Sequence, residues 1–384
     1  KYNEIDKGIL KGEYRFSIIL ELIITLIILS IGIIKQNIIL ILFAITIIPA
    51  NCSTFFKGIF QATGEFSYYT NVIKIYTILY TIFNVILVFM VKSKQYIHYC
   101  LAILISYLIT QIVLEIKLKR KYKNNKTRYP ENIKEMIKIG TLVLLGDLSV
   151  AVLFGIDKWF VKWFLTTEDF AYYSFAVSML NIINTLVNAI SVTFYNYLFT
   201  NNQKENVNKL KDYLIILGGL SSTGYFALKF IVEIWVKKYI PSLDVIAITF
   251  AIFPYMILIN SLYVNLYKIN KDEKKYFKVV LSMLIISIIY NIIAVLIYKN
   301  NISIAYATVL TLITWVVYST YDLENIKYNR KNVVYLSIMT ITFLLTAHCF
   351  NWWIGGICYF SIFIITTLIL KSETVKRLVK VKKK

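Results

Sequence analysis

Residues 139–165 read IGTLVLLGDLSVAVLFGIDKWFVKWFL, an apolar run with Asp147 near its middle and Asp157, Lys158 and Lys162 towards its end. An α-helix rises 1.5 Å per residue, so about 20 such residues cross a hydrocarbon core about 30 Å thick. The run is therefore long enough to span a membrane. Its charged side chains need a physical reason, because a charge at the bilayer centre costs about 2.5–3.5 kcal/mol on insertion scales.

Similar apolar blocks recur along the whole chain. Of its 384 residues, 58% are hydrophobic and 16% are charged, whereas ordinary soluble domains carry about 25% charged residues. This pattern predicts an all-α polytopic membrane protein with twelve transmembrane helices, and Pro49 and Pro254 are expected to kink two of them. The predicted spans are 15–34, 38–60, 68–91, 97–118, 136–160, 170–198, 213–236, 241–268, 275–298, 302–321, 333–350 and 353–370.

Basic residues are distributed unevenly between the two sides of these spans. With the N-terminus placed inside, 33 of the 42 Lys and Arg lie in or beside inner segments, eight lie beside outer loops, and Lys229 lies within a span. Because short loops rich in Lys and Arg stay cytoplasmic, the C-terminus is also predicted to be cytoplasmic. The net charge of +21 thus has a topological origin. Nucleic-acid binding is not needed to explain it, although the inner basic segments suit anionic membrane lipids.

The longest inner connection, KLKRKYKNNKTRYPENIKEMIK at 117–138, carries nine basic residues and predicts a linker between two helical bundles. The expected segments are an incomplete N-terminal lobe of four helices at 1–118, a basic cytoplasmic linker at 119–135, a six-helix C-terminal lobe at 136–321, and two extra helices with a basic tail at 322–384. Two further helices at the front would bring the first lobe to six. The first residue is Lys1, and we expect the chain to lack its first two transmembrane helices.

Asp147 is the charged residue nearest the middle of the fifth predicted span. It is a candidate for ion coupling, for an orienting group in a cavity, or for a hydrogen bond between helices. At 100° per residue, a continuous helix places Lys158 and Lys162 within about 60° of Asp147, and Asp157 about 80° to the other side. The two lysines are equally suited to reach the outer interface beside Trp159 and Trp163.

Two other spans carry polar stripes. Thr70, Lys74, Thr77, Thr81 and Asn84 follow one face of the third span. In the sixth span, the stripe comprises Ser174, Ser178, Asn181, Thr185 and Asn188, extended by Asn184, Ser191 and Tyr195. Hydroxyl and amide groups in such stripes can bind sugar hydroxyls in a wet cavity, or they can hydrogen-bond between helices. The sequence alone leaves both interpretations open.

Lys229 and Glu233 lie one helical turn apart in the seventh span. They can neutralise each other as an ion pair. Alternatively, Lys229 faces an anionic part of a substrate and Glu233 takes part in ion coupling. The four cysteines and two histidines show no metal-binding or disulfide spacing, so neither a metal nor a cofactor is expected.

The segment IKIGTLVLLGDLSVAVLFGIDKWFVKWFLTTEDFAYYSFAVSMLNIINTLVNAISVTFYNYL, residues 137–198, resembles the start of the C-terminal lobe of bacterial polysaccharide-biosynthesis flippases. These are the Wzx-like members of the multidrug/oligosaccharidyl-lipid/polysaccharide (MOP) exporter superfamily. Ile156, Asp157 and Lys158 match the end of one family helix, and the run from Tyr173 to Phe175 matches the opening of the next. The run GIFQATGEFSYYTNVIK at 58–74 is similar to the inner Gln-x-x-Gly-Glu/Lys turn of the family.

The resemblance implies a fold of two helical lobes of the MOP/MATE-like type and a transporter rather than an enzyme. Its substrate would be an undecaprenyl-pyrophosphate-linked oligosaccharide, moved by alternating access across the bacterial cytoplasmic membrane for surface polysaccharide biosynthesis. Association with polysaccharide assembly proteins is a further expectation. On this hypothesis Lys74, Lys158 and Lys229 with the two stripes bind substrate, and Asp147, Asp157 and Glu233 couple ions, with Asp147 preferred. The alternatives are a polytopic polysaccharide polymerase or glycosyltransferase, and a multidrug exporter.

Overall fold

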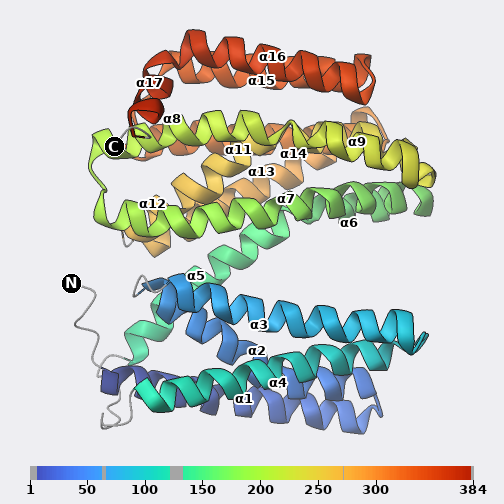
Figure 1. Ribbon diagram of the computed structural model, residues 1–384, viewed down its shortest axis with the longest axis vertical. Helices are drawn as coiled ribbons and strands as arrows, with labels where there is room; N and C mark the ends of the chain where they lie inside the picture. Colours follow the sequence, from blue (N-terminus) through green and yellow to red (C-terminus); the bar gives the residue numbers. More distant parts are fainter. Residues whose placement is uncertain (1–6, 63–65, 122–132, 271, 382–384) are drawn as a thin grey trace. The chain divides into compact units, whose positions relative to one another are not determined.

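The computed structural model describes residues 7–62, 66–121, 133–270 and 272–381, apart from some side chains within these ranges. Every regular element in them is a helix, which confirms the all-α prediction (Figure 1). The chain divides into two compact units, Lys1–Glu135 and Met136–Lys384, each described by itself. The predicted four-segment division remains a prediction. Most of the basic linker and part of the turn at 58–74 lie outside the described residues.

The first unit, unit 1, contains four long helices and a π-helical turn: α1 (Lys7–Ile34), α2 (Ile38–Ala62), α3 (Phe66–Val85), η2 (Ile86–Met90) and α4 (Tyr96–Lys121). The second unit, unit 2, contains α5 (Ile133–Leu153), which begins just before it, then α6 (Ile156–Phe164), α7 (Thr167–Thr200), α8 (Lys204–Ser221), α9 (Gly224–Trp235), η3 (Lys237–Ser242), α10 (Leu243–Phe250), α11 (Phe253–Leu258), η4 (Ile259–Tyr263), α12 (Val264–Ile269), α13 (Glu273–Ile297), α14 (Asn301–Asp322), α15 (Arg330–Cys349), α16 (Trp352–Leu370) and α17 (Ser372–Val381).

Unit 1 is held together where α1, α2 and α4 meet. Its core contains Tyr14, Cys52, Phe56, Phe60, Val72 and Leu114. The Tyr14 hydroxyl donates to Glu115 Oε1 at 2.8 Å, and the Gln111 amide donates to the same oxygen at 2.9 Å. The carboxylate of Glu115 is therefore hydrogen-bonded within the helix bundle, where an unsatisfied charge would be costly.

The centre of unit 2 is the broken helix that runs from η3 to α12. All residues of 243–259 except Asp244 are buried, because α7, α8 and α14 pack around this segment. The two parts Lys237–Phe250 and Phe253–Ile269 are bent by 43° at the break. Pro254 lies in the first turn of α11, in agreement with the expected kink, whereas α2 continues as a helix through Pro49.

A close helix crossing fixes this central segment against α8. A Cβ atom on Gly218 would lie 2.5 Å from Pro254 Cα, closer than two non-bonded carbons can approach. Only glycine permits that separation, because both atoms belong to rigid backbone.

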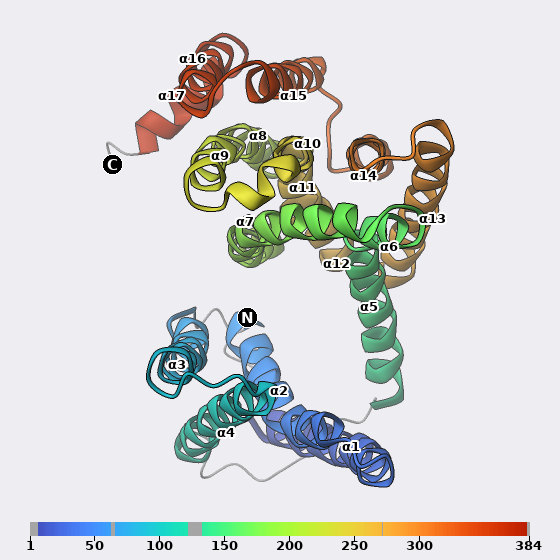
Figure 2. The same ribbon diagram turned by 90° about the vertical axis from the view of Figure 1, so that its right-hand side faces the viewer.

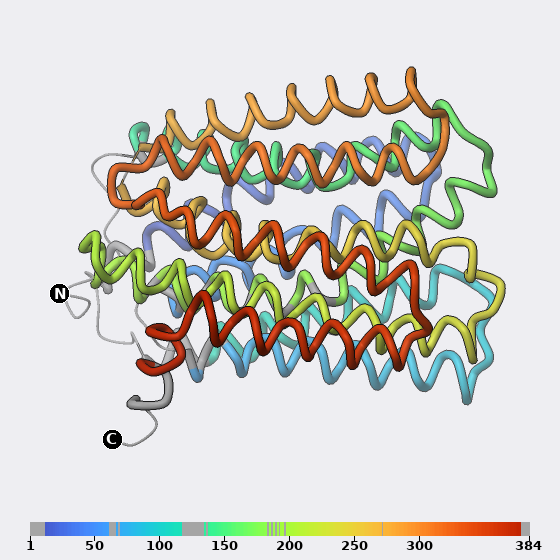
Figure 3. The backbone as a smooth tube through the Cα atoms, turned by 90° about the horizontal axis from the view of Figure 1, so that it is seen from above, coloured from blue at the N-terminus to red at the C-terminus, as the bar shows by residue number. Residues whose placement is uncertain are grey.

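Figure 3 shows the long helices of unit 2 running back and forth in nearly parallel rows.

The fifth predicted span is a broken helix. α5 and α6 are bent by 42° relative to each other, with Gly155 as the N-cap of α6 (Figure 2). The prediction of one continuous helix over 136–160 is therefore wrong. Its angular argument also fails beyond Leu153, because the 100° step applies only within an unbroken helix.

Nine segments of the described chain are long and apolar enough to cross a membrane, and the two bent pairs raise the number to eleven. Each of the eleven overlaps a predicted span. The remaining span, 170–198, lies in α7, where several side chains are outside the described set. The chain is a multi-pass membrane protein, and the number twelve remains a prediction.

Candidate functional site

The carboxylate of Asp147 on α5 joins three helices of unit 2. Lys268 Nζ on α12 donates to Asp147 Oδ1 at 2.8 Å, and the Tyr276 hydroxyl on α13 donates to the same oxygen at 2.6 Å. The Lys268 ammonium also lies 5.2 Å from the centroid of the Tyr276 ring, within the range of a cation–π contact. We call these three residues the Asp147 cluster.

A glycine positions the cluster. Gly146 faces the Tyr276 ring so closely that a Cβ atom would lie 2.3 Å from Tyr276 Cε1. The ring itself is fully buried, so it has little room to retreat. The absence of a side chain at Gly146 thus lets α5 approach α13 until the Tyr276 hydroxyl reaches Asp147.

The Asp147 cluster is accessible from outside unit 2. The Asp147 side chain is 52% exposed and that of Lys268 is 25% exposed. A charge in a membrane-spanning segment needs a partner or a wet cavity, and Lys268 supplies the partner. The pair is therefore both neutralised and open to a ligand or to water.

Asp157 occupies a different environment, in the core of unit 2. Its side chain accepts from the Tyr173 hydroxyl at 2.8 Å and from the Lys158 backbone N–H at 2.8 Å. Thr308 on α14 is a further hydrogen-bonding neighbour of both Asp157 and Tyr173. Asp157, Tyr173 and Thr308 are all buried, so this second group, the Asp157 cluster, ties α6 to α7 and α14 inside the unit.

The lysines of α6 are not part of a continuous stripe with Asp147, because the helix breaks between them. Lys158 is half-buried; its backbone N–H donates to Asp157, and its side-chain charge also interacts with that carboxylate. The Lys162 ammonium lies 5.3 Å from the centroid of the Trp159 ring. Trp159 and Trp163 are exposed, as expected for an interfacial aromatic pair. The geometry of Lys162 favours the interfacial interpretation.

The polar stripe of α7 divides into two parts. Ser178, Asn181, Thr185 and Asn188 are all exposed on unit 2, although the hydroxyls of Ser178 and Thr185 bond to backbone carbonyls of their own helix. Ser191, in contrast, donates to Asn260 O at 2.7 Å, and Asn265 Nδ2 donates to Ser191 O at 3.0 Å. The stripe is therefore open to a ligand up to Asn188 and joins helices beyond it.

The stripe of α3 lies on the surface of unit 1. Lys74, Thr77 and Thr81 are exposed, and Asn84 is half-buried and donates to Tyr80 O at 2.7 Å. Exposed polar side chains on a membrane helix are poorly suited to hydrocarbon. This face is therefore better suited to water, to a ligand or to other protein groups.

Lys229 does not pair with Glu233. Both residues belong to the described part of the chain, and no ion pair joins them there. The Lys229 ammonium instead donates to Ala347 O at 3.0 Å and to Phe350 O at 2.9 Å, at the C-terminal end of α15. A cation at this position stabilises the last carbonyls of the helix.

The arrangement matches known proteins in both sequence and fold. Residues 9–199 match the model of the family described as polysaccharide biosynthesis protein. The match spans just under half of the chain, so this part of it is similar to members of that family. The resemblance to Wzx-like flippases drawn from the sequence is thereby confirmed. No sequence among the curated proteins matches the chain.

A solved structure shares the fold of this chain. It is the lipid II flippase MurJ in an inward closed conformation, superposed with a TM-score of 0.66. The match covers 97% of this chain and 87% of that chain at 15% sequence identity. At that identity the likeness establishes a common fold, without a common substrate.

The sequence analysis did not identify the partners of either aspartate. Lys268, Tyr276 and Thr308 were not among its candidate residues. A signal was present for Lys268, because it is the only basic residue of the mostly apolar segment 243–269. Nothing in the local sequence indicates that Tyr276 or Thr308 faces a carboxylate.

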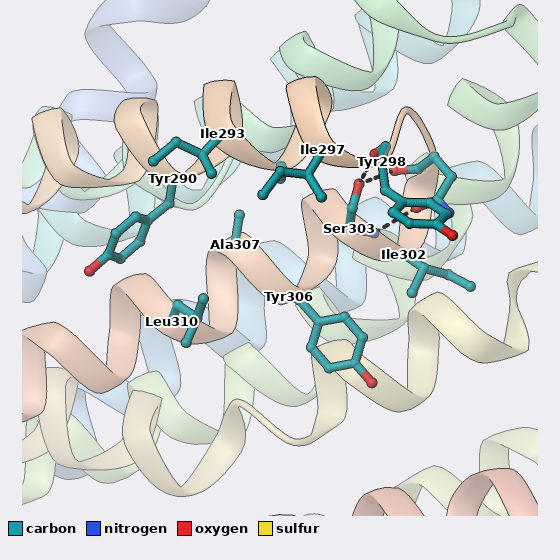
Figure 4. A pocket seen from close by; sticks show the side chains of 11 residues that line it. Tyr290, Ile293, Ile297, Tyr298, Ile302, Ser303, Tyr306, Ala307 and Leu310 are labelled. Carbon is teal, nitrogen blue, oxygen red and sulfur yellow. Dashed lines mark hydrogen bonds between the residues drawn. The ribbon is translucent and has the colours of Figure 1, made fainter.

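One cavity of unit 2 is lined mainly by apolar side chains. It has a volume of about 470 Å³ and lies between α13 and α14, where Ile293 and Ile297 of α13 and Leu310 of α14 line it (Figure 4). Its lining includes Asn300 and Ser303 but no charged residue, so it suits a hydrocarbon chain better than a glycan. Within the described chain, no three His, Cys, Asp or Glu residues are grouped to hold a metal ion.

Proposed function

We propose that the chain is a flippase that moves an undecaprenyl-pyrophosphate-linked oligosaccharide from the inner to the outer leaflet of the bacterial cytoplasmic membrane. The observation that carries this proposal is the family match over residues 9–199, joined to a fold shared with a lipid II flippase. Transport would proceed by alternating access and serve surface polysaccharide biosynthesis. On this proposal the protein is a transporter, not an enzyme.

The exposed polar residues are the proposed substrate contacts. Lys74 supplies a cation for the pyrophosphate on unit 1, and Thr77, Thr81 and Asn84 supply hydrogen-bonding groups on the same helix. On unit 2, Ser178, Asn181, Thr185 and Asn188 offer hydroxyl and amide groups to the glycan. Amide and hydroxyl side chains suit this task because each both donates and accepts hydrogen bonds.

The Asp147 cluster is the proposed coupling device. While Lys268 contacts Asp147, the carboxylate is neutralised, and when the pair separates Asp147 becomes free to bind a proton or a cation. A ligand pyrophosphate near Lys268 would favour that separation, because it competes with Asp147 for the same ammonium group. Ion binding and substrate binding would thus be linked through a shared partner.

The test is rescue of surface polysaccharide in a bacterial cell that lacks its own polysaccharide flippase. The full-length gene is expected to restore the polymer and to remove the accumulated lipid-linked precursor. A parallel strain lacking its polymerase serves as the control and should gain nothing. Rescue of the polymerase strain alone would show an enzyme of the same pathway and overturn the proposal.

A further inference from the structure

A second cavity in unit 2 contains a buried lysine, Lys211, that forms no ion pair with a carboxylate among the described residues. The cavity has a volume of about 230 Å³ and lies where α8, α14 and α15 come together. Lys211 lines it and is only 4% exposed. The Lys211 ammonium donates to a single backbone acceptor, Lys327 O, at 3.3 Å. An ammonium group has three donors, so most of its hydrogen-bonding capacity is unused.

The neighbouring charges do not compensate Lys211. The nearest carboxylate, that of Asp212, binds Lys371 at 2.6 Å, and Lys371 also contacts the amide oxygen of Asn332. Lys371 is itself 4% exposed. Two buried ammonium groups, those of Lys211 and Lys371, therefore share the carboxylate of Asp212. Burying an unpaired charge is costly, so an anionic ligand would be stabilising here.

The remaining lining suits the headgroup region of a lipid. The polar side is made by Asn329 and Asn332 at the start of α15 and by Thr320. The N-terminus of α15 adds backbone N–H groups and the positive end of its dipole. The apolar side is made by Leu258, Val316, Val317, Val333 and Leu336. A polar end that continues into an apolar wall is complementary to an amphiphile rather than to a free ion.

The mouth of the cavity faces outward between the ends of α14 and α15. Tyr321 and Tyr328 both line the cavity, are 70% and 55% exposed, and stack with ring centroids 5.8 Å apart. Tyrosines are enriched at the level of lipid headgroups. The asymmetry of basic residues assigns this end to the cytoplasmic side, and the amphipathic helix α17, which packs against α8 and α16, lies at the same end (Figure 1).

We propose that this cavity binds the phosphate of an anionic phospholipid from the inner leaflet, with Lys211 as the principal charge partner. Basic pockets between transmembrane helices on the cytoplasmic side are known to take such headgroups. A cavity of about 230 Å³ is too small for an oligosaccharide, so the ligand is a membrane lipid and not the cargo. The bound lipid would hold together α8, α14 and α15. It would thereby stabilise the fold of unit 2, whether or not substrate is being transported.

The proposal is tested with the full-length protein purified in detergent, by the rise in melting temperature on adding phosphatidylglycerol. The wild type and Lys204→Met, an exposed lysine on the same helix, are expected to respond equally. Lys211→Met is expected to weaken the apparent affinity about tenfold, the loss of one charge-assisted contact. An unchanged response in Lys211→Met would overturn the proposal.

A second pair of variants decides the matter if Lys211→Met does not fold. Val333 lines the cavity and Val334 does not, while both are exposed and should accept a larger side chain. Val333→Trp is expected to abolish the phosphatidylglycerol response and Val334→Trp to retain it. Equal responses in the two variants would place the lipid elsewhere.

The choice of probe separates the sources of phosphate. Phosphatidylcholine, which carries no net charge, and inorganic phosphate are expected to act weakly. An equal effect of inorganic phosphate would overturn the lipid assignment, and an equal effect of phosphatidylcholine would overturn the charge argument. A response only to undecaprenyl pyrophosphate would identify a cargo site instead. Because the assay involves no glycan and no transport, failure here leaves the proposed flippase activity standing.

Discussion

The ammonium group of Lys268 lies 2.8 Å from the carboxylate of Asp147, and so the end of the central broken helix of unit 2 is tied to α5. The two residues are 121 positions apart in sequence. Their contact resolves the question raised by a carboxylate near the middle of an apolar run. Asp147 is tolerated there because a cation from another helix reaches it, and its 52% exposure keeps it available for a functional role.

Removing the cation of this pair should destabilise the protein more than removing both charges. Lys268→Met is expected to lower the free energy of unfolding in detergent by about 1 kcal/mol, because Asp147 then lacks a counter-charge in the span. The double variant Asp147→Asn/Lys268→Met should recover part of that stability, although it lacks the carboxylate proposed for ion coupling. Lys278→Met, an exposed lysine on α13, is the control. A double variant no better than the single one would contradict a role for charge balance.

The close approach of Gly146 to Tyr276 predicts that alanine substitution at Gly146 and at Gly140, both on α5, will affect stability differently. Gly146→Ala places a methyl group against the buried Tyr276 ring and should destabilise the protein by about 1–3 kcal/mol, the usual range for overpacking. Gly140→Ala meets no atom within 4 Å and should be neutral or stabilising, because Ala favours the helix. The measurement is the melting temperature in detergent. Equal effects would show that Tyr276 can move aside freely.

The sequence predicted where the membrane helices lie, but it did not predict where they break or which helices contact each other. Eleven predicted spans overlap segments that are long and apolar enough to cross a membrane, because a membrane helix must be apolar along a fixed length. The break at Gly155 was not predicted, since a glycine within an apolar run is compatible with a continuous helix. The pairing of Asp147 with Lys268 depends on which helix faces α5, and no local pattern encodes that choice.

The angular argument shows the same limit. Phase along one continuous helix placed Asp157 away from Asp147, but the helix breaks before Asp157, so its position in the core does not follow from that phase. The prediction could not show that Tyr173 and Thr308 would meet it there. In the stripes of α3 and α7, Lys74, Thr77, Thr81, Ser178, Asn181, Thr185 and Asn188 are exposed, whereas Asn84, Ser174 and Asn184 are half-buried. Ser191 departs from the group because its partners come from η4 and α12.

Two neighbouring tyrosines of α7 are expected to differ in their contribution to stability. Tyr173→Phe removes the hydroxyl that donates to buried Asp157 and should cost about 1–3 kcal/mol, because a buried acceptor is left short of a donor. Tyr172→Phe removes a bond to Glu168 at an exposed site and should change stability by less than about 0.5 kcal/mol. Chemical or thermal unfolding in detergent measures both. Similar losses would argue against the Asp157 cluster as a structural tie.

Asp157 also has a separate functional test. Asp157→Asn keeps an acceptor for Tyr173 while removing the charge, so the fold should survive. If Asp157 couples an ion, the variant should still bind substrate but should no longer respond to an imposed pH or sodium gradient in vesicles. A variant with the normal gradient response would leave Asp147 as the remaining aspartate candidate.

Lys229 is expected to contribute to stability, and Lys74 is expected to contribute to substrate binding. The Lys229 ammonium donates hydrogen bonds to the carbonyls of Ala347 and Phe350. Lys229→Met should therefore lower the free energy of unfolding by about 1–2 kcal/mol, seen as a lower melting temperature. The KM for lipid-linked substrate should stay unchanged. Lys74 is exposed, so Lys74→Met should raise the KM severalfold with little effect on melting. The reverse pattern, with a raised KM and normal melting in Lys229→Met, would return Lys229 to the substrate site. The two variants remove the same charge and differ only in whether carbonyls of the protein already use it.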